Sequence, residues 1–204
     1  MRAAVRRLTD AACALCRSTV TFGGLPSSIR MWPISEMEDV VAETPDFTLE
    51  VKGVKGLCPA GERWAERQIA EGRIPVFSCE GGCIRGEIAR LAANRVAREA
   101  PYARACHAET FFVPHSGMAQ WVKQAKQVVV IDGCFLKCHG RPLKGLIDEE
   151  KLVQIEAHPL HKKHSDVFLM DDVPEAERKE IADEVGTKIL AMLRDGARPA
   201  AEGA

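Results

Sequence analysis

The sequence predicts an α/β fold: an open, mainly parallel sheet with helices on both faces, arranged in Rossmann-like layers. Residues 128–131 are four consecutive β-branched residues without polar alternation, which is typical of a strand buried on both faces of a parallel sheet. A second apolar stretch, residues 74–78, is followed by a helical pattern from about residue 86. Strand, loop and helix repeat in this order along the chain, which favours right-handed parallel connections.

Length and composition set the domain organisation. The chain has 204 residues, of which 46% are hydrophobic, enough for one domain with a sizeable core and an extension. We expect an N-terminal extension of uncertain fold over residues 1–72, an α/β domain over 73–196 and a disordered tail over 197–204.

Charge and cysteine content narrow the possible functions. A net charge of −1 and few aromatic residues give no reason to expect a nucleic-acid partner. No run approaches the roughly 20 apolar residues of a membrane span, so we expect no membrane partner and a cytoplasmic protein. Eight cysteines in a reducing compartment indicate metal or redox chemistry.

The N-terminal segment is basic. Residues 1–35 carry five arginines and one acid, Asp10, a composition that suits an organellar targeting arm over residues 1–30 and a mitochondrial matrix location. We favour instead the basic arm of a bacterial-type protein. Cys13 and Cys16 have a spacing that suits zinc or a redox dithiol, although we favour buried, inert thiols on an apolar helix.

Residues that end helices and alternating apolar residues predict the elements before the first buried strand. Residues 36–42 suit a short helix, and residues 47–51 alternate like a half-exposed strand at the sheet edge. A helix is expected from about Pro59 to Glu71, ended by Gly72. Cys58 therefore lies near a helix N-terminus, where the dipole favours a thiolate.

The remaining elements follow in order. After the strand at 74–78 and a helix over about 86–99, residues 105–115 contain a strand, and a short helix spans Met118 to Val122. The strand at 128–131 leads to a helix from Arg141 to about Glu149, a strand at 152–155 and an exposed loop at 158–164. A last helix begins at the capping sequence of Asp172–Glu175 and ends at Gly196; its core stripe is Ile181, Val185, Ile189 and Met192.

Two cysteine pairs follow the two buried strands. Cys79 and Cys83 come after the first strand, and Cys134 and Cys138 come after the second. Ligand sites of open α/β sheets form outside the carboxyl ends of strands, so four thiolates could meet there. Such a tetrad suits zinc, and an iron-sulfur cluster uses the same ligands.

Other side chains could contribute to this site. Cys106, His107 and His139 are candidate additional or replacement ligands, although for each histidine we favour a surface or hydrogen-bonded side chain. Asp132 could act as a general base, although Asp-Gly after a strand is more often a turn. His158, His161 and His164 are not expected to form a metal site, because on a helix steps of three residues would spread their side chains.

The cysteine motifs also resemble those of a known family. The runs Cys79-Glu-Gly-Gly-Cys83, Gly-Glu-Ile-Ala-Arg and Ile-Asp132-Gly-Cys134-Phe-Leu-Lys-Cys138 resemble the DGC-domain family, whose zinc binding is inferred from its cysteines. The resemblance covers residues from about 74 to 195. It implies a metal site formed by Cys79, Cys83, Cys134 and Cys138, with Cys106 as a further family position.

Two classes of function are compatible with these residues. The first is a non-catalytic zinc module that is structural or hands metal on. The second is a thiol-redox or sulfur-transferring enzyme in which Cys106 or Cys58 reacts beside the metal. No acid–base pair is placed by a motif, so the sequence does not decide whether the chain is an enzyme.

Overall fold

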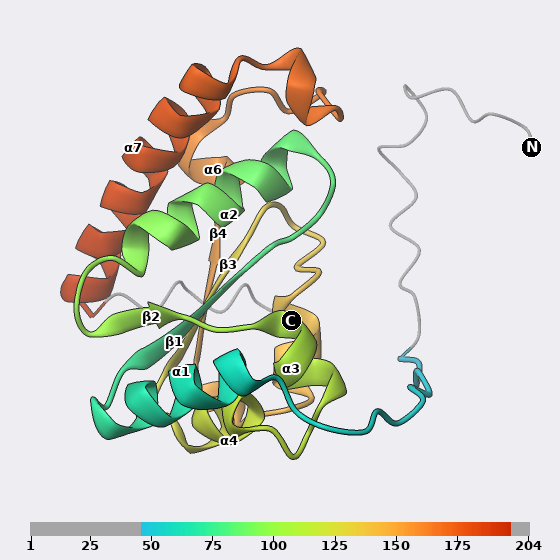
Figure 1. Ribbon diagram of the computed structural model, residues 1–204. Helices are drawn as coiled ribbons and strands as arrows, with labels where there is room; N and C mark the ends of the chain where they lie inside the picture. The colour runs from blue at the N-terminus through green and yellow to red at the C-terminus, as the bar shows by residue number, and fades with distance from the viewer. Residues whose placement is uncertain (1–45, 197–204) are drawn as a thin grey trace, which may run out of the picture. The chain divides into compact units, whose positions relative to one another are not determined.

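The computed structural model describes residues 46–196, and a compact unit of the chain begins at Glu50. Strands and helices alternate through most of this unit (Figure 1). The elements are α1 (Pro59–Ala70), β1 (Ile74–Ser78), α2 (Ile84–Val96), β2 (Tyr102–Arg104), α3 (His107–Phe112), α4 (Gly117–Gln124), β3 (Val128–Asp132), α5 (Gly140–Lys144), the 3-10 helix η2 (Glu149–Lys151), β4 (Leu152–Glu156), α6 (His158–His161), the 3-10 helix η3 (Met170–Asp172) and α7 (Glu175–Arg194).

The four described strands form one parallel sheet in the order β2-β1-β3-β4. β3 is central and all five of its residues are buried, as its β-branched run predicts. Ser78 at the end of β1 lies opposite Ile131 of β3, so the carboxyl ends of these two strands reach the same edge. The prediction of an open parallel sheet is confirmed.

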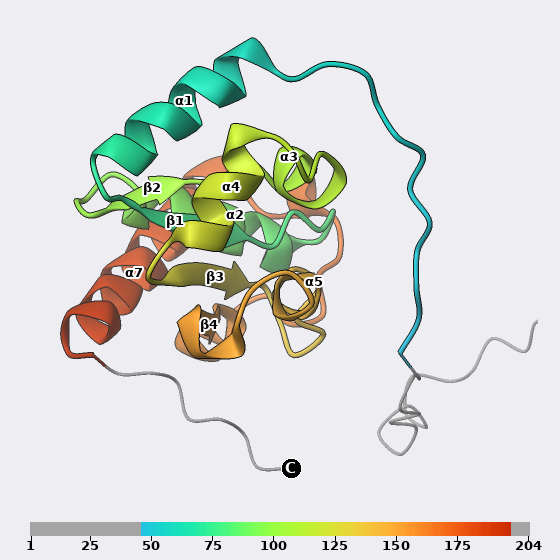
Figure 2. The same cartoon turned by 90° about the horizontal axis from the view of Figure 1, so that it is seen from below.

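Helices cover both faces of the sheet, as predicted. α2 and α7 pack against each other on one face, and α1 and α4 lie on the other (Figures 1 and 2). The side chains of β3 alternate between two cores: Val129 and Ile131 join α2 and α7, whereas Val128 and Val130 join α1 and α4. Alternate residues of a strand point to opposite faces, and β3 therefore needs apolar side chains at every position.

Helices α1 and α7 were predicted with nearly the right bounds. Gly72, just beyond α1, has a φ of 62°, a left-handed conformation that glycine adopts readily. On α7, Ile181, Val185 and Ile189 are buried, and Met192 is partly buried against the same core, which confirms the predicted stripe. The expected cap is wrong, because Pro174 precedes the helix and no side chain caps it.

Two predicted strands are wrong. Residues 47–51 belong to no strand and are exposed. In the segment 105–115, residues 107–112 form α3, and the strand lies just before it, at β2. β2 is an edge strand of three residues, too short for a periodic pattern to reveal.

Three further boundaries differ from expectation. The helix expected up to Glu149 ends at Lys144, and η2 follows. Residues 158–161, expected in an exposed loop, form the half-buried helix α6. The compact unit includes α1, which the sequence analysis placed in the extension over residues 1–72. The predictions for residues 1–30 and 36–42, and for the thiols of Cys13 and Cys16, lie outside the described residues.

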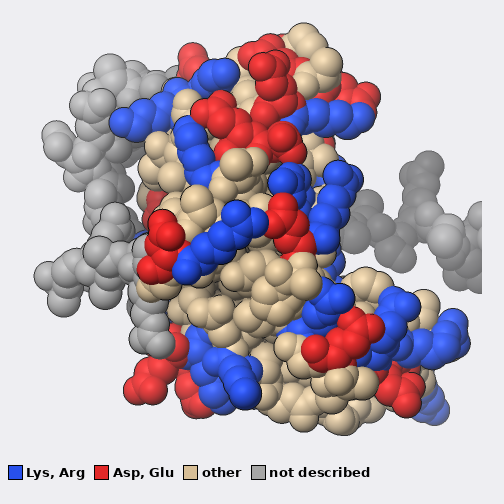
Figure 3. Space-filling model, turned by 90° about the vertical axis from the view of Figure 1, so that its left-hand side faces the viewer, with Lys and Arg blue, Asp and Glu red and all other residues tan. Residues whose placement is uncertain are grey.

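The described surface adds two observations. None of the described helices combines the length and apolar character that a membrane crossing requires. On the side of the molecule where α7 lies in Figure 1, basic and acidic residues are interspersed (Figure 3). This face therefore has no continuous basic area of the kind that phosphate backbones attract.

Candidate functional site

The candidate site lies at the carboxyl ends of β1 and β3, where the sheet topology reverses. From β1 the chain passes through α2 to β2 on one side, and from β3 it passes through α5 to β4 on the other. α2 and α5 pack on opposite faces of the sheet. Such a switch point leaves a crevice between the two connections, which is where open α/β sheets bind ligands. Both predicted cysteine pairs follow these two strands.

Cys79 is the buried thiol at this edge. Its residue is 6% exposed, and its backbone N–H continues the β1–β3 pairing to Ile131 O at 2.8 Å. Its Sγ accepts a hydrogen bond from the backbone N–H of Gly81 at 3.4 Å. Burial raises the pKa of the Cys79 thiol above its ordinary value, the backbone N–H groups of Gly81 and Gly133 act to lower it, and the charges of Cys138 and Asp132 raise it further. Groups from both loops therefore surround this sulfur.

Close backbone packing brings the two loops together. A Cβ on Gly133 would lie 2.8 Å from the backbone C and O of Arg85, and one on Gly86 would lie 2.5 Å from Gly81 O. Neither distance leaves room for a side chain. The first loop, the start of α2 and the second loop meet here because glycines occupy the contacts.

The two cysteines of the first pair lie near each other. The Sγ atoms of Cys79 and Cys83 lie 3.3 and 3.9 Å from the point where a Cβ on Gly81 would stand. Cys83 is the N-cap residue of α2, has no side-chain capping bond and is half-buried. Its thiol is thus close to Cys79 and accessible.

Asp132 holds the second loop in place. It is fully buried and accepts hydrogen bonds from His139 N at 3.0 Å, Gly140 N at 3.2 Å and Gln154 Nε2 at 2.8 Å. These bonds tie the end of the loop back to the end of β3. The carboxylate is occupied by loop donors, which supports a structural role for Asp132 over a catalytic one.

The second loop also contains a left-handed residue. Lys137, directly before Cys138, has a φ of 49°, and its N–H donates to Cys134 O at 3.1 Å. A non-glycine residue in this region costs of order 1–3 kcal/mol and persists where surrounding contacts require it. The turn separates Cys134, which is half-buried, from Cys138, which is exposed.

Two histidines adjoin the cysteine loops. The rings of His107 and His139 meet edge to face with centroids 4.7 Å apart, and His107 Nε2 accepts the N–H of Ser78 at 3.4 Å. Burial, followed by the charges of His139 and Arg104, lowers the pKa of His107 to about 4. Burial also lowers the pKa of His139, whose Nδ1 is buried without a described hydrogen-bond partner. Neutral imidazole is the form that binds metals.

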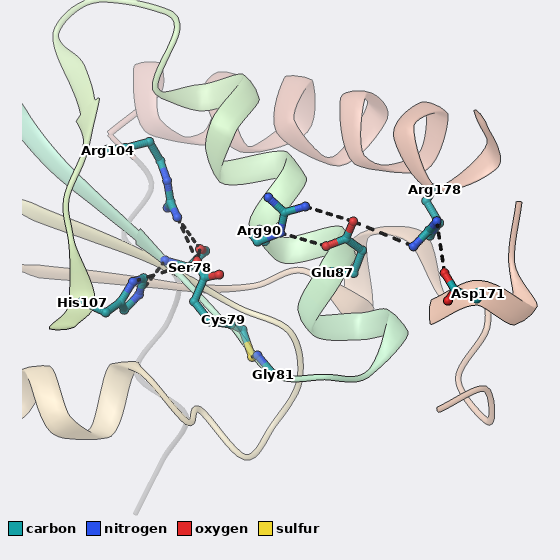
Figure 4. Close-up of polar contacts among 10 residues, drawn as sticks. Ser78, Cys79, Gly81, Glu87, Arg90, Arg104, His107, Asp171 and Arg178 are labelled. Carbon is teal, nitrogen blue, oxygen red and sulfur yellow. Dashed lines mark hydrogen bonds and ion pairs between the residues drawn. The ribbon is translucent and has the colours of Figure 1, made fainter. Parts of the chain in front are cut away.

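An arginine network that sequence reasoning missed borders the same edge. Arg104 at the end of β2 donates to Ser78 Oγ at 2.8 Å and to Glu80 Oε1 at 3.0 Å, and Ser78 Oγ donates to Glu80 at 2.6 Å. Figure 4 shows Arg104 and His107 both reaching toward Ser78. Polar residues at the carboxyl end of a strand would have indicated this network. The predicted strand lay within residues 105–115, so Arg104 was not recognised as the end of β2.

A second chain of ion pairs continues along α2. Arg90 pairs with Glu87 at 2.8 Å, and Arg178 of α7 lies 4.0 Å from Glu87 and 3.8 Å from Asp171 (Figure 4). A pocket between the first loop and α2 is lined by residues that include Glu80, Glu87 and Arg90. Acidic and basic groups here pair with one another, and Arg178 Nε is buried without a hydrogen-bond partner among the described residues.

The two other cysteines within residues 46–196 lie at helix starts. Cys106 is exposed and is the N-cap residue of α3, just after β2. Cys58 is exposed and is the N-cap residue of α1, where its Sγ accepts the N–H of Gly61 at 3.4 Å. The expected position of Cys58 at a helix N-terminus is confirmed.

The structure thus brings Cys79 close to Cys83 and within electrostatic range of Cys138. Within residues 46–196, however, no three His, Cys, Asp or Glu side chains are grouped closely enough to hold a metal ion. The donor types fit a soft metal, and their side chains are not gathered around one point. His158 and His161 pack ring to ring, and His164 pairs with Glu177 at 2.9 Å.

Comparison with known proteins gives one match. A family model described as DGC domain matches residues 75–185, more than half of the chain, and this range contains both cysteine pairs and Cys106. No curated protein matches the chain, and no solved structure does.

Proposed function

The chain belongs to the DGC-domain family, and on that premise we propose that it is a metal-binding α/β protein that holds one zinc ion at the carboxyl edge of its sheet. The proposed ligands are Cys79, Cys83, Cys134 and Cys138. Cys106 and the neutral His139 are candidates for an additional or replacement position.

The observation that carries this proposal is the position of the Cys79 sulfur. It accepts the N–H of Gly81 in the first cysteine loop at 3.4 Å, and, against the raising effect of burial, the backbone N–H of Gly133 in the second loop lowers its pKa. The two pairs are 51 or more residues apart in sequence, yet their loops contact each other at the switch point. Thiolates from two loops are the usual arrangement of a structural zinc site.

In this proposal, metal binding itself brings the four cysteine side chains together. Cys83 and Cys134 are half-buried and Cys138 is exposed, so rotation of these side chains requires no repacking of the core. Metal sites rarely preform completely, and binding energy then adds to local folding energy. A bound zinc ion would cross-link the two loops. The residues themselves need only supply thiolates and hold the loops side by side.

Native mass spectrometry and thermal melts test the proposal. We expect about one zinc ion per chain, and Cys134→Ser should lose it, melt earlier and no longer respond to a zinc chelator. Cys13→Ser, Cys16→Ser and Cys58→Ser are matched controls that should retain metal. If chelator shifts the Cys134→Ser melt as much as the wild-type melt, Cys134 is not a ligand. A metal-free, fully folded wild-type protein would end the proposal.

Two outcomes would change the metal or its location. Iron and a broad visible absorption band would replace zinc with an iron-sulfur cluster on the same thiolates. Replacing His158, His161 and His164 together with Ala should leave the metal content unchanged. Loss of a stoichiometric metal in that variant would place the site at residues 158–164 instead.

A second candidate function is thiol-redox or sulfur-transfer chemistry. It is favoured by Cys58, which is exposed at the N-terminus of α1 and accepts the Gly61 N–H, because a reactive thiol must be accessible to its partner. Cys79 is a poor nucleophile here, since burial raises its pKa. Faster alkylation of Cys58 than of Cys106 or a free thiol at neutral pH would support this alternative, and equal rates would oppose it.

A further inference from the structure

The pocket between the first cysteine loop and α2 has a use that the metal proposal does not give it. Its volume is about 200 Å³, and its lining consists of three charged side chains, Glu80, Glu87 and Arg90, with three glycines and Met170. Pockets for drug-sized ligands measure roughly 300–1,000 Å³, so this one suits a smaller molecule. None of the lining residues is a proposed zinc ligand.

Glu80 is held in one orientation and keeps one oxygen free. Its Oε1 accepts hydrogen bonds from Ser78 Oγ at 2.6 Å and from Arg104 Nη2 at 3.0 Å. Among the described residues, no donor bonds to its Oε2, and the side chain is 35% exposed. A carboxylate that two donors fix in place can therefore accept a hydrogen bond from a ligand through its second oxygen.

Arg90 is held in a similar way by Glu87 (Figure 4). Its Nε and Nη2 donate to the two oxygens of Glu87 at 2.8 and 3.0 Å, which fixes the guanidinium plane. Within residues 46–196 its Nη1 has no acceptor, and the side chain is 37% exposed. The pKa of Arg90 is raised first by the hydrogen bond to Glu87 and, among smaller causes, by the charge of Glu80. Glu80 and Arg90 thus lie within electrostatic range of each other.

The ion pairs around the pocket balance in charge. Three basic side chains pair with three acidic ones: Arg90, Arg104 and Arg178 with Glu80, Glu87 and Asp171. A ligand with a net charge would upset this balance, whereas a ligand that carries both charges meets one free group of each sign. The glycines and Met170 are apolar and suit an aliphatic group.

We propose that this pocket binds a small zwitterion of the amino-acid type with an aliphatic side chain. The ammonium group donates to Glu80 Oε2, the carboxylate accepts from Arg90 Nη1, and the aliphatic group packs against Met170. Both protein charges are already fixed by their neighbours, so little side-chain freedom is lost on binding. Gly81 and Gly82 separate the first two cysteines and also line the pocket, so the ligand lies beside that pair.

The test uses the full chain and three probes of similar size at neutral pH. L-leucine carries both charges, L-leucinamide lacks the carboxylate, and 4-methylpentanoate lacks the ammonium group. The backbone amide NMR signals of Gly81 and Gly82 report each titration. We expect L-leucine to bind about tenfold or more tightly than either analogue, because each analogue leaves one charged group of the pocket without its partner. Unchanged Gly81 and Gly82 signals with L-leucine, or equal affinities for the three probes, would overturn the proposal.

Two variants assign each ligand charge to its residue. Glu80→Gln should lose the preference for L-leucine over 4-methylpentanoate and keep the preference over L-leucinamide, and Arg90→Gln should do the reverse. Glu71→Gln and Arg95→Gln are matched controls that should keep both preferences, because these residues form ion pairs outside the pocket. A folded Glu80→Gln or Arg90→Gln chain that keeps both preferences, or a control that loses either, would overturn the proposal. The comparison of the three probes on the wild type needs no substitution, so it decides the matter even where a variant fails to fold.

Discussion

Asp132 illustrates how a single side chain can organise a site that it does not enter. A fully buried carboxylate is costly unless donors compensate it. Asp132 has three such donors, two of them backbone N–H groups at the end of the second cysteine loop. The residue that gives the family motif its first letter therefore acts through the position of the cysteines that follow it.

Replacing the Asp132 carboxylate should lower the stability of the fold. In Asp132→Asn, one oxygen is exchanged for an NH₂ group that faces donors, so buried N–H groups lose their acceptor at a cost of about 1–3 kcal/mol. Urea unfolding should show this loss. Asp166→Asn, at an exposed position, is the control and should change stability by less than about 0.5 kcal/mol. Equal effects of the two substitutions would contradict the role given to Asp132.

The lowered pKa of His161 should make the free energy of unfolding depend on pH. Burial, then the charges of His158, His164 and Lys163, lowers its pKa from 6.5 to about 4. The unfolded chain therefore takes up a proton before the folded chain as the pH falls. Stability should be retained above pH 6.5 and decrease as the pH is lowered toward 4.

The measurement is urea unfolding at pH 7 and pH 5 with chelator present throughout, which removes any contribution from metal. His161→Gln cannot take up this proton, so its stability difference between the two pH values should be smaller than that of the wild type. His115→Gln, at an exposed position, should keep the wild-type difference. An unchanged difference in His161→Gln would show that other groups cause the pH dependence.

At the scale of elements, the site depends on how closely α2 approaches the two loops. Gly133 contacts the backbone of Arg85, and Gly86 contacts the backbone of Gly81. Backbone atoms cannot rotate away as a flexible side chain can. The packing of one helix start against two loops thus sets the separation of the cysteine pairs.

A methyl group in this contact should push the loops apart. Gly133→Ala would place a Cβ 2.8 Å from Arg85 C and O, and overpacking of this kind typically costs about 1–3 kcal/mol. We also expect weaker zinc retention against a chelator. Gly145→Ala is the matched control, since its Cβ would lie 3.5 Å from the nearest atom, Pro142 O, an ordinary contact. If both variants unfold alike, close packing at Gly133 is not required.

At the scale of the whole molecule, α1 belongs to the folded core even though it precedes the first strand and lies before the matched family region. Ala65 is fully buried, Trp64 Nε1 donates to Arg104 O at 3.0 Å and Glu62 Oε1 accepts Gly117 N at 2.8 Å. These contacts join α1 to β2 and to the start of α4. The sheet face that α4 covers is therefore closed only when α1 is present.

Truncation tests this dependence. A chain of residues 56–204 should unfold cooperatively in thermal melts followed by circular dichroism, because it retains α1 and its N-cap residue, Cys58. A chain of residues 73–204 should lose the cooperative transition or melt at a much lower temperature, since the apolar surface of α4 would be exposed. A cooperative melt of the shorter chain near the temperature of the longer one would place the domain boundary at residue 73 instead.

The sequence by itself determined the parallel sheet, most of the helices and the neighbourhood of the two cysteine pairs. The run at β3 is apolar at every position because both faces are covered, and this requirement is visible in the residues themselves. The positions of Cys79 and Cys134 directly after buried strands followed from the same local pattern. These features depend on residues that are close together in the chain.

Only the tertiary structure decided which strand-like segments pair and which polar groups meet. Residues 47–51 and β4 both have strand patterns, yet only β4 lies beside a described partner, and no local pattern encodes that difference. The contact of His107 with His139, the arginine network at Arg104 and the two loops around the Cys79 sulfur join residues 24 to 54 positions apart. Such distances result from the packing of whole elements, because a few ångströms of helix displacement change them while the sequence pattern stays the same.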